Sequence, residues 1–442
     1  MSYNLSTYKM AKRDTTLIEE DLEITAATYG AAPVQLPGKV ISIFPALAHR
    51  NFQLYFLGQA ISLVGFWLQQ VGLGYFIFQL TNSAFWVGAV MAIGGLPFLF
   101  LTTFAGVLID KVNKKKLLIW TQIIEAIIAA IMGFLILTGH ANLTSLTLLV
   151  FLSGIAGSID LPARLAFIVE MVGKRDLASA IPINNGLFNA ARFIGPALAG
   201  GLIVTLGVGW VFIINALSFI AGIWAIANIK PVYSFPTDVN SHWQSLKTGL
   251  SYAFGHPKLF SLMTLATITA IFLWPYQTLM PVIAEKVYAS GAGGLGSLLS
   301  AAGAGSLVGA IFTSSQSRRK ERGTLVFFGL LISSLSLIAF AIVENFLLAH
   351  VLLAIAGFGM LVQVSTVNTL VQLAAPDQMR GRVMAVYITM FVGMMPLGNA
   401  FAGFLAQHTS PQFTVGLGGL VMLLVGIFMY AKGTFSNFKS AV

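Results

Sequence analysis

Apolar side chains follow one another in long runs that short polar gaps separate. The runs lack the alternation of a half-buried strand, and each is long enough to cross a bilayer as a helix, which takes about 20 residues. Only helices and closed barrels satisfy all their backbone polar groups in hydrocarbon. The pattern therefore predicts an all-α polytopic membrane protein with twelve transmembrane helices, at about 54–80, 83–109, 117–138, 145–168, 181–205, 209–229, 259–284, 293–315, 324–343, 347–373, 383–407 and 413–431.

The composition excludes several classes of protein. Of the 442 residues, 57% are apolar and 9% are charged, against about 45–50% and about 25% in soluble proteins. A soluble enzyme, a disordered chain and a disulfide-stapled domain are therefore excluded, and the chain contains no cysteine. Its histidines are scattered, and no Walker loop is present. We expect no cofactor, no metal and no ATP hydrolysis, which disfavours an integral-membrane enzyme.

The positive charges indicate an orientation. The net charge is +10, but the Lys and Arg residues fall in gaps between apolar runs, which argues against a nucleic-acid partner. Fifteen lie in one alternate set of gaps, whereas the other set contains only Lys286. Because cytoplasmic loops carry the excess of Lys and Arg, we expect both termini in the cytoplasm and a location in the bacterial inner membrane.

A long-range repeat predicts two halves. Gly106-x-x-x-Asp110, with lysines after it, recurs 203 residues later as Gly309-x-x-x-Thr313, with basic residues after it. We expect two pseudo-symmetric six-helix bundles and an amphipathic linker helix on the inner membrane surface. The predicted segments are a cytoplasmic tail at 1–45, a bundle at 46–229, the linker at 230–258, a second bundle at 259–432 and a tail at 433–442.

Several motifs resemble those of the major facilitator superfamily. The segment from Gly106 to Lys115 resembles its loop motif between the second and third helices, and Gly195-Pro196-Ala-Leu-Ala-Gly200 resembles the fifth-helix motif of its antiporters. Segments 160–167 and 376–387 resemble the branch that contains the enterobactin (siderophore) exporters and the transmembrane secretion effectors. The resemblance implies an inner-membrane exporter driven by the proton gradient. The arginine usual in the fourth helix of drug antiporters is missing from 148–157.

Four charged residues lie inside predicted spans, all in the first half: Glu125, Asp160, Arg164 and Arg192. A charge at bilayer depth is costly, so it needs a partner or a watery cavity. A carboxylate that gains and loses an arginine as the halves rock would bind and release a proton, which suggests Asp160 or Glu125 as the carrier. Alternatively, Asp160 and Arg164 form a fixed ion pair at the cytoplasmic gate. Arg192 would either attract an acidic substrate or pair with one of the two acids.

Other residues are predicted to form the gate, a helix bend and the cavity. The gate motif, whose lysines would also meet anionic lipid headgroups, comprises Gly106, Asp110, Lys111, Lys114, Lys115, Arg380 and Arg382. The bend comprises Gly195, Pro196 and Gly200. Amide and aromatic residues suited to a substrate cavity are Gln59, Trp67, Gln69, Asn184, Asn185, Asn189, Arg192, Trp274, Tyr276, Gln277, Gln363, Asn368 and Asn399. Amides also join helices to one another, so that role stays an alternative.

These features predict a secondary transporter that works by alternating access. We expect it to export a small molecule such as a siderophore or a drug-like compound, in exchange for protons, and to act as a monomer in contact with membrane lipids. A lipid or lysophospholipid flippase on the same fold, an importer of a small solute and a non-transporting receptor are the alternatives.

Overall fold

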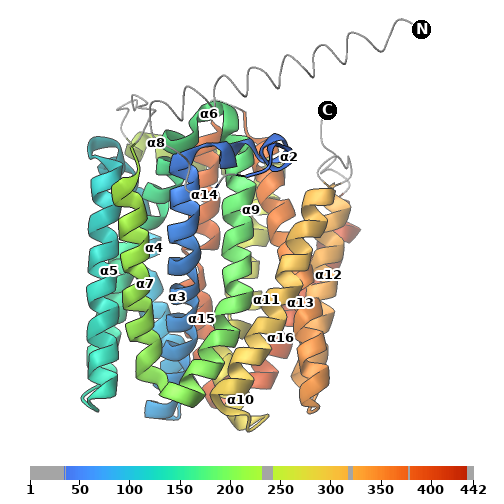
Figure 1. Cartoon of the computed structure of the whole chain (residues 1–442). Coiled ribbons are helices and arrows are strands. Elements are labelled where there is room, and N and C mark those ends of the chain that lie inside the picture. The colour runs from blue at the N-terminus through green and yellow to red at the C-terminus, as the bar shows by residue number, and fades with distance from the viewer. Residues whose placement is uncertain (1–33, 35, 231–241, 317–321, 377–378, 436–442) are drawn as a thin grey trace, which may run out of the picture.

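The protein is a bundle of long helices that stand side by side (Figure 1). The computed structural model describes residues 34, 36–230, 242–316, 322–376 and 379–435, and every regular element in this part of the chain is helical. Eleven helices are long and apolar enough to cross a membrane. One of them, 64 residues in length, contains two spans. The prediction of twelve transmembrane helices is confirmed.

The first half is built on five long helices after two short ones. A glycine divides the longest of these helices: Gly173 has φ +72° and ψ 173°, a conformation that side-chain-bearing residues avoid. The parts before and after Gly173 correspond to the predicted runs 145–168 and 181–205. The elements are α2 (Gly38–Ile43), η1 (Pro45–Ala48), α3 (Arg50–Thr81), α4 (Ala84–Lys111), α5 (Lys114–Leu137), α6 (Leu143–Leu206) and α7 (Val208–Asn228).

Two membrane segments of the second half are interrupted near their middle. The first contains a π-helical turn, η2, in which Trp274 N–H donates to the Thr269 carbonyl at 2.9 Å, and Pro275, which has no N–H to donate, follows directly. The second breaks before Pro396. The elements are α8 (His242–Gly255), α9 (Pro257–Ile268), η2 (Thr269–Leu273), α10 (Tyr276–Lys286), α11 (Gly291–Ser315), α12 (Arg322–Ile342), α13 (Phe346–Ala374), α14 (Arg380–Phe391), α15 (Met395–His408) and α16 (Pro411–Ala431).

The bundle has two ends. We call the end with α2 and α8, at the top of Figure 1, the terminal face. The other end, where α10 lies, is the opposite face. Four helices that begin at the opposite face do so with a Ser or Asn side chain that accepts a hydrogen bond from the first turn: Ser83, Asn142, Asn345 and Ser410. These caps satisfy N–H groups that the helix itself leaves unpaired.

Large apolar side chains cover the outside of the bundle. Trp120 is 63% exposed and Leu347 is 76% exposed, whereas the polar side chains of Gln59 and Gln122 are buried. This distribution reverses that of a soluble protein and suits a lipid solvent. The chain is a multi-pass membrane protein.

Small residues join the two halves closely on the side of the opposite face. A Cβ atom added at Gly88 of α4 would lie 2.7 Å from the Cα of Gly403 of α15, and one added at Gly296 of α11 would lie 2.8 Å from the Cα of Gly200 of α6. The halves are therefore packed closely together toward the opposite face.

Candidate functional site

A buried ion pair joins three helices of the first half. Asp160, 8% exposed, pairs with Arg164 one helical turn later on α6. Its other carboxylate oxygen, Oδ1, accepts a 2.7 Å hydrogen bond from the Thr121 hydroxyl of α5. Arg164 also donates to the side-chain oxygen of Gln59 on α3. The structure thus brings together the predicted residues Asp160, Arg164 and Gln59, and each charge has a partner.

Glu125 lies one turn along α5 from Thr121 and faces α6. Its Oε2 atom accepts a 2.7 Å hydrogen bond from the Ser153 hydroxyl. Among the described residues it forms no ion pair. The predicted pairing of Glu125 with an arginine is therefore absent from this conformation, because the part of α6 that faces it presents a serine.

Arg192 lies at the boundary between the halves. It is 5% exposed, and its guanidinium carbon lies 5.9 Å from the ring centre of Trp67 on α3 and 5.0 Å from that of Trp274, just before α10. The alternative that pairs Arg192 with Glu125 or Asp160 does not occur in this structure. Arg192 belongs to the second part of α6, which packs on α11 of the other half, whereas Asp160 belongs to the first part and binds α5.

The predicted gate residues lie near the terminal face. Lys114 forms an ion pair of 2.8 Å with Glu170, and Lys115 donates at 2.7 Å to the carbonyls of Ala227 and Ile229, where α7 ends. These contacts remain within the first half. Arg380 donates to the Gln372 carbonyl at 3.4 Å, and Arg382 lies 3.7 Å from the Met379 sulfur. The side chains of Gly106, Asp110 and Lys111 lie outside the described residues, so their role stays a prediction.

Many of the predicted cavity amides form hydrogen bonds with neighbouring residues. Gln69 accepts from Asn215 at 2.8 Å, Gln363 donates to Thr269 at 2.8 Å, and Asn399 accepts from Thr278 at 2.8 Å. Asn184 accepts from Tyr55 at 3.4 Å, Asn189 donates to the Asn185 carbonyl at 2.9 Å, and Asn368 accepts from Gln372 at 2.7 Å. In this conformation these side chains mainly hold helices together, and their contact with a substrate stays a prediction.

The predicted bend residues are packing points. A Cβ atom added at Gly195 would overlap the Trp67 side chain, and the Pro196 carbonyl lies against Gly296 of α11. Gly200 meets the same stretch of α11. The bend motif therefore brings the second part of α6 against both α3 and the other half.

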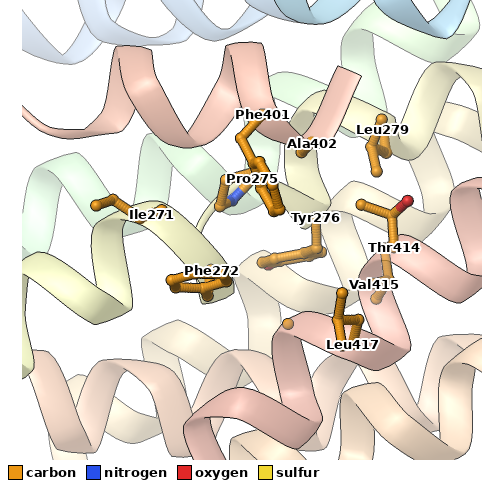
Figure 2. A pocket seen from close by; sticks show the side chains of 11 residues that line it. Ile271, Phe272, Pro275, Tyr276, Leu279, Phe401, Ala402, Thr414, Val415 and Leu417 are labelled. Atoms are coloured by element: carbon orange, nitrogen blue, oxygen red, sulfur yellow. The ribbon is translucent and has the colours of Figure 1, made fainter. Parts of the chain in front are cut away.

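A small hollow on the side of the second half is mostly apolar. Figure 2 shows it between η2, the start of α10, α15 and α16, with the side chains of Phe272, Tyr276 and Phe401 around it. Phe401 is 41% exposed on the outside of the bundle. Of the residues predicted from the sequence, only Tyr276 lines this hollow, and the charged residues are not part of it.

Sequence reasoning missed the neutral partners of the two acids. Thr121 and Ser153 supply hydroxyl groups to Asp160 and Glu125. Thr121 lies four residues before Glu125 and hence on the same helix face, which is a usable signal, but single hydroxyl residues are common in membrane helices. The hydrogen bond between His49 and Asp176, at 2.7 Å near the terminal face, was also missed. No group of three possible metal ligands occurs among the described residues.

Residues 41–440 match a family model described as "Transmembrane secretion effector". This match covers most of the chain. The chain belongs to the transmembrane secretion effector family, within the major facilitator superfamily. The family membership predicted from the motifs is confirmed, and the chain is a secondary transporter of the major facilitator type.

Two curated relatives of this chain are named as siderophore transporters. An enterobactin exporter of Shigella flexneri is 26% identical over 387 residues, which cover 86% of this chain and 91% of that protein. A staphyloferrin A transporter of Staphylococcus aureus is 22% identical and covers 85% of this chain and 94% of its own. These relatives are membrane transporters and not enzymes.

Solved structures share the fold. A bacterial homologue of the human lysosomal transporter Spinster, in an inward-facing and unoccupied conformation, has a TM-score of 0.65 at 16% identity and covers 88% of this chain and 96% of its own. A peptide transporter of the POT family, in complex with alafosfalin, has a TM-score of 0.71 at 13% identity. The match covers 92% of this chain and 100% of that transporter. At these identities the likeness supports the fold alone.

Proposed function

We propose that this chain is a proton-driven exporter of a small molecule of the siderophore kind. It would act in the bacterial inner membrane with the terminal face in the cytoplasm. The names of both curated relatives support the substrate class, and the name of the enterobactin exporter supports the direction of transport. The fifteen-to-one distribution of basic residues supports the orientation, and the exposed Lys116 is placed to meet lipid headgroups.

The ion pair of Asp160 with Arg164 carries the proposal of proton coupling. A buried carboxylate keeps its negative charge at an acceptable cost only while a positive group and hydrogen bonds compensate it. Arg164 and the Thr121 hydroxyl provide both in this conformation. A movement that withdraws Arg164 would favour protonation of Asp160, and its return would expel the proton.

The contacts between the halves support alternating access. At the opposite face, Ser83 donates to Gln407 at 3.0 Å, and the Lys286 ammonium lies 5.5 Å from the ring centre of Phe78. These contacts close the boundary between the halves at this face. Rocking of one half against the other would open the opposite face and release the substrate outside the cell.

An untargeted comparison of released metabolites tests this function. Cells with the gene, without it, and with the Asp160→Asn variant are grown in low and high iron, and their media are compared by mass spectrometry. We expect one small-molecule class to accumulate outside only with the wild-type chain, and more strongly in low iron. The same metabolites in the media of all three strains, or depletion of a solute from the medium by the wild-type strain, would contradict export by this chain.

A further inference from the structure

Four polar atoms gather without hydrogen-bond partners where the two halves meet. They are Trp67 Nε1, Arg192 Nη2, the Tyr276 hydroxyl and Gln277 Nε2, and each is buried. Nine buried side-chain atoms in the described part of the chain lack a partner, so this one region holds almost half of them. Such atoms are rare in folded proteins and call for an explanation. We call these four residues the donor cluster.

The members of the donor cluster come from both halves. Trp67 lies on α3 and Arg192 on α6, and the Arg192 guanidinium lies 5.9 Å from the Trp67 ring. Tyr276 and Gln277 are the first two residues of α10, and the Tyr276 hydroxyl lies beside both Arg192 and Gln277. Three of the four atoms can only donate hydrogen bonds, whereas the tyrosine hydroxyl can donate or accept. Donors therefore outnumber acceptors among the four atoms.

The local charge is positive, and no carboxylate pairs with it among the described residues. The guanidinium carbon of Arg192 lies over the rings of Trp67 and Trp274 instead. Helix α10 begins at this point, and its N-cap, Pro275, supplies no side-chain cap. The N-terminus of a helix carries a partial positive charge, and broken helices in transporters direct it at anionic substrate groups.

The cluster is bordered by Phe188 of α6 and by helix α11. Phe188, 40% exposed, is one turn from Arg192 and contacts the Trp67 ring edge-on with 5.7 Å between ring centres. Behind the cluster, α11 closes the boundary, since a Cβ atom on Gly303 would lie 2.6 Å from the Arg192 carbonyl. The cluster therefore lies against the packed boundary between α6 and α11.

We propose that the donor cluster binds a carboxylate group of the transported molecule, so that the substrate class is an organic acid. The two carboxylate oxygens would accept from the edge of Arg192, and Trp67, Tyr276 and Gln277 would donate to them or to a neighbouring hydroxyl or carbonyl oxygen of the same molecule. Because donors of both halves meet one anion, its binding draws the halves together. The assignment of this ligand as the exported molecule rests on the proposed function, whereas carboxylate binding itself does not.

Binding to the purified full chain in detergent tests the site without any proton gradient. The probes are citrate and 2-hydroxybenzoate, each compared with its uncharged methyl ester by calorimetric titration. We expect at least one acid to bind at least tenfold more tightly than its ester. Arg192→Gln should weaken that binding at least tenfold. Arg192→Lys should retain part of the wild-type affinity, because the lysine ammonium keeps the charge but lacks the planar pair of donors of the guanidinium.

Two smaller changes separate binding from folding. Trp67→Phe and Tyr276→Phe keep a ring in place and remove one hydrogen-bond donor each. Each variant should weaken the binding of the acid about two- to fivefold. Trp224→Phe, at a side chain 61% exposed on the outside of the bundle, is the matched control and should change nothing. Failure of both acids to bind, equal binding of acid and ester, or full affinity in Trp67→Phe and Tyr276→Phe would overturn the proposal. Acid binding in a chain that exports nothing would uphold this site and contradict the proposed function.

Discussion

Ser83 donates a 3.0 Å hydrogen bond to Gln407, which lies 324 residues later in the chain. The bond joins the residue before α4 to the end of α15, and the Phe85 N–H donates to the same Gln407 oxygen at 3.4 Å. A surface contact of this kind adds little stability, but its position matters. It marks the place where the two halves must separate if the opposite face is to open.

A disulfide at this place should stop transport. The chain has no cysteine of its own, so Ser83→Cys with Gln407→Cys gives a single defined pair. We expect oxidation to cross-link the two residues and to reduce transport at least tenfold, because the opposite face can no longer open, and we expect a reductant to restore it. Transport of a released metabolite into everted vesicles, before and after reduction, provides the measurement.

A second cysteine pair serves as the control. Ser297 and His350 form a 2.9 Å hydrogen bond between α11 and α13, within one half. A cross-link between Ser297→Cys and His350→Cys should leave transport unchanged. If the pair at positions 83 and 407 cross-links fully and transport continues, the halves do not separate there.

Loss of the Asp160 charge should uncouple transport from protons. Asp160→Asn keeps the shape and a partner for Thr121 but leaves Arg164 unpaired, which in a buried pair costs about 3–5 kcal/mol. The double variant Asp160→Asn with Arg164→Gln removes both charges and should restore the yield of folded protein, while exchange of labelled substrate persists and proton-driven accumulation is lost. Asp176→Asn, which affects the pair with His49 near the terminal face, is the control. An unchanged pH dependence in the double variant would rule out Asp160 as the carrier.

Glu125 should contribute less than Asp160. It binds the Ser153 hydroxyl and has no positive partner among the described residues, and glutamine can accept the same hydrogen bond. We expect Glu125→Gln to keep proton-driven transport within about threefold of the wild type, because no charge pair is broken. Transport against pH is the measurement, with Glu344→Gln, an exposed residue at the opposite face, as the control. Uncoupling by Glu125→Gln but not by Asp160→Asn would reverse the assignment.

The sequence was sufficient for the fold because the bilayer imposes a strong constraint. A run of about 20 apolar residues has no alternative to a helix in hydrocarbon, so the spans could be predicted from hydropathy alone. The four-residue spacing of Asp160 and Arg164 on one helix face likewise predicted their pair. These successes depend on local periodicity.

Contacts between distant helices were not predictable in the same way. One of the two alternatives for Arg192 was a pair with Glu125 or Asp160, but in this structure Arg192 lies over Trp67 and Trp274. Gln69 accepts a hydrogen bond from Asn215 of α7, a partner that its position in the sequence did not indicate. The rotation of each helix about its axis and the pairing of the two halves decide these partners, and neither can be deduced from the spacing of residues within one helix.

The orientation of the chain can be tested by labelling. Lys116 is exposed at the terminal face and Glu344 at the opposite face, so each can be changed to cysteine in a chain that has no other. We expect a membrane-impermeant maleimide to label Glu344→Cys but not Lys116→Cys in intact cells, because basic loops stay inside. Permeabilised cells, in which both should react, are the control. Labelling of Lys116→Cys from outside would invert the topology and the direction of transport.

Accumulation in everted membrane vesicles tests proton-driven export most directly. The metabolite found only in the medium of cells with the gene is supplied outside vesicles whose interior is made acidic, and its uptake is followed with time. The account predicts concentrative uptake that requires the chain and the pH gradient and that a protonophore abolishes. Uptake that is the same with and without the gradient, or that occurs only in right-side-out vesicles, would contradict it.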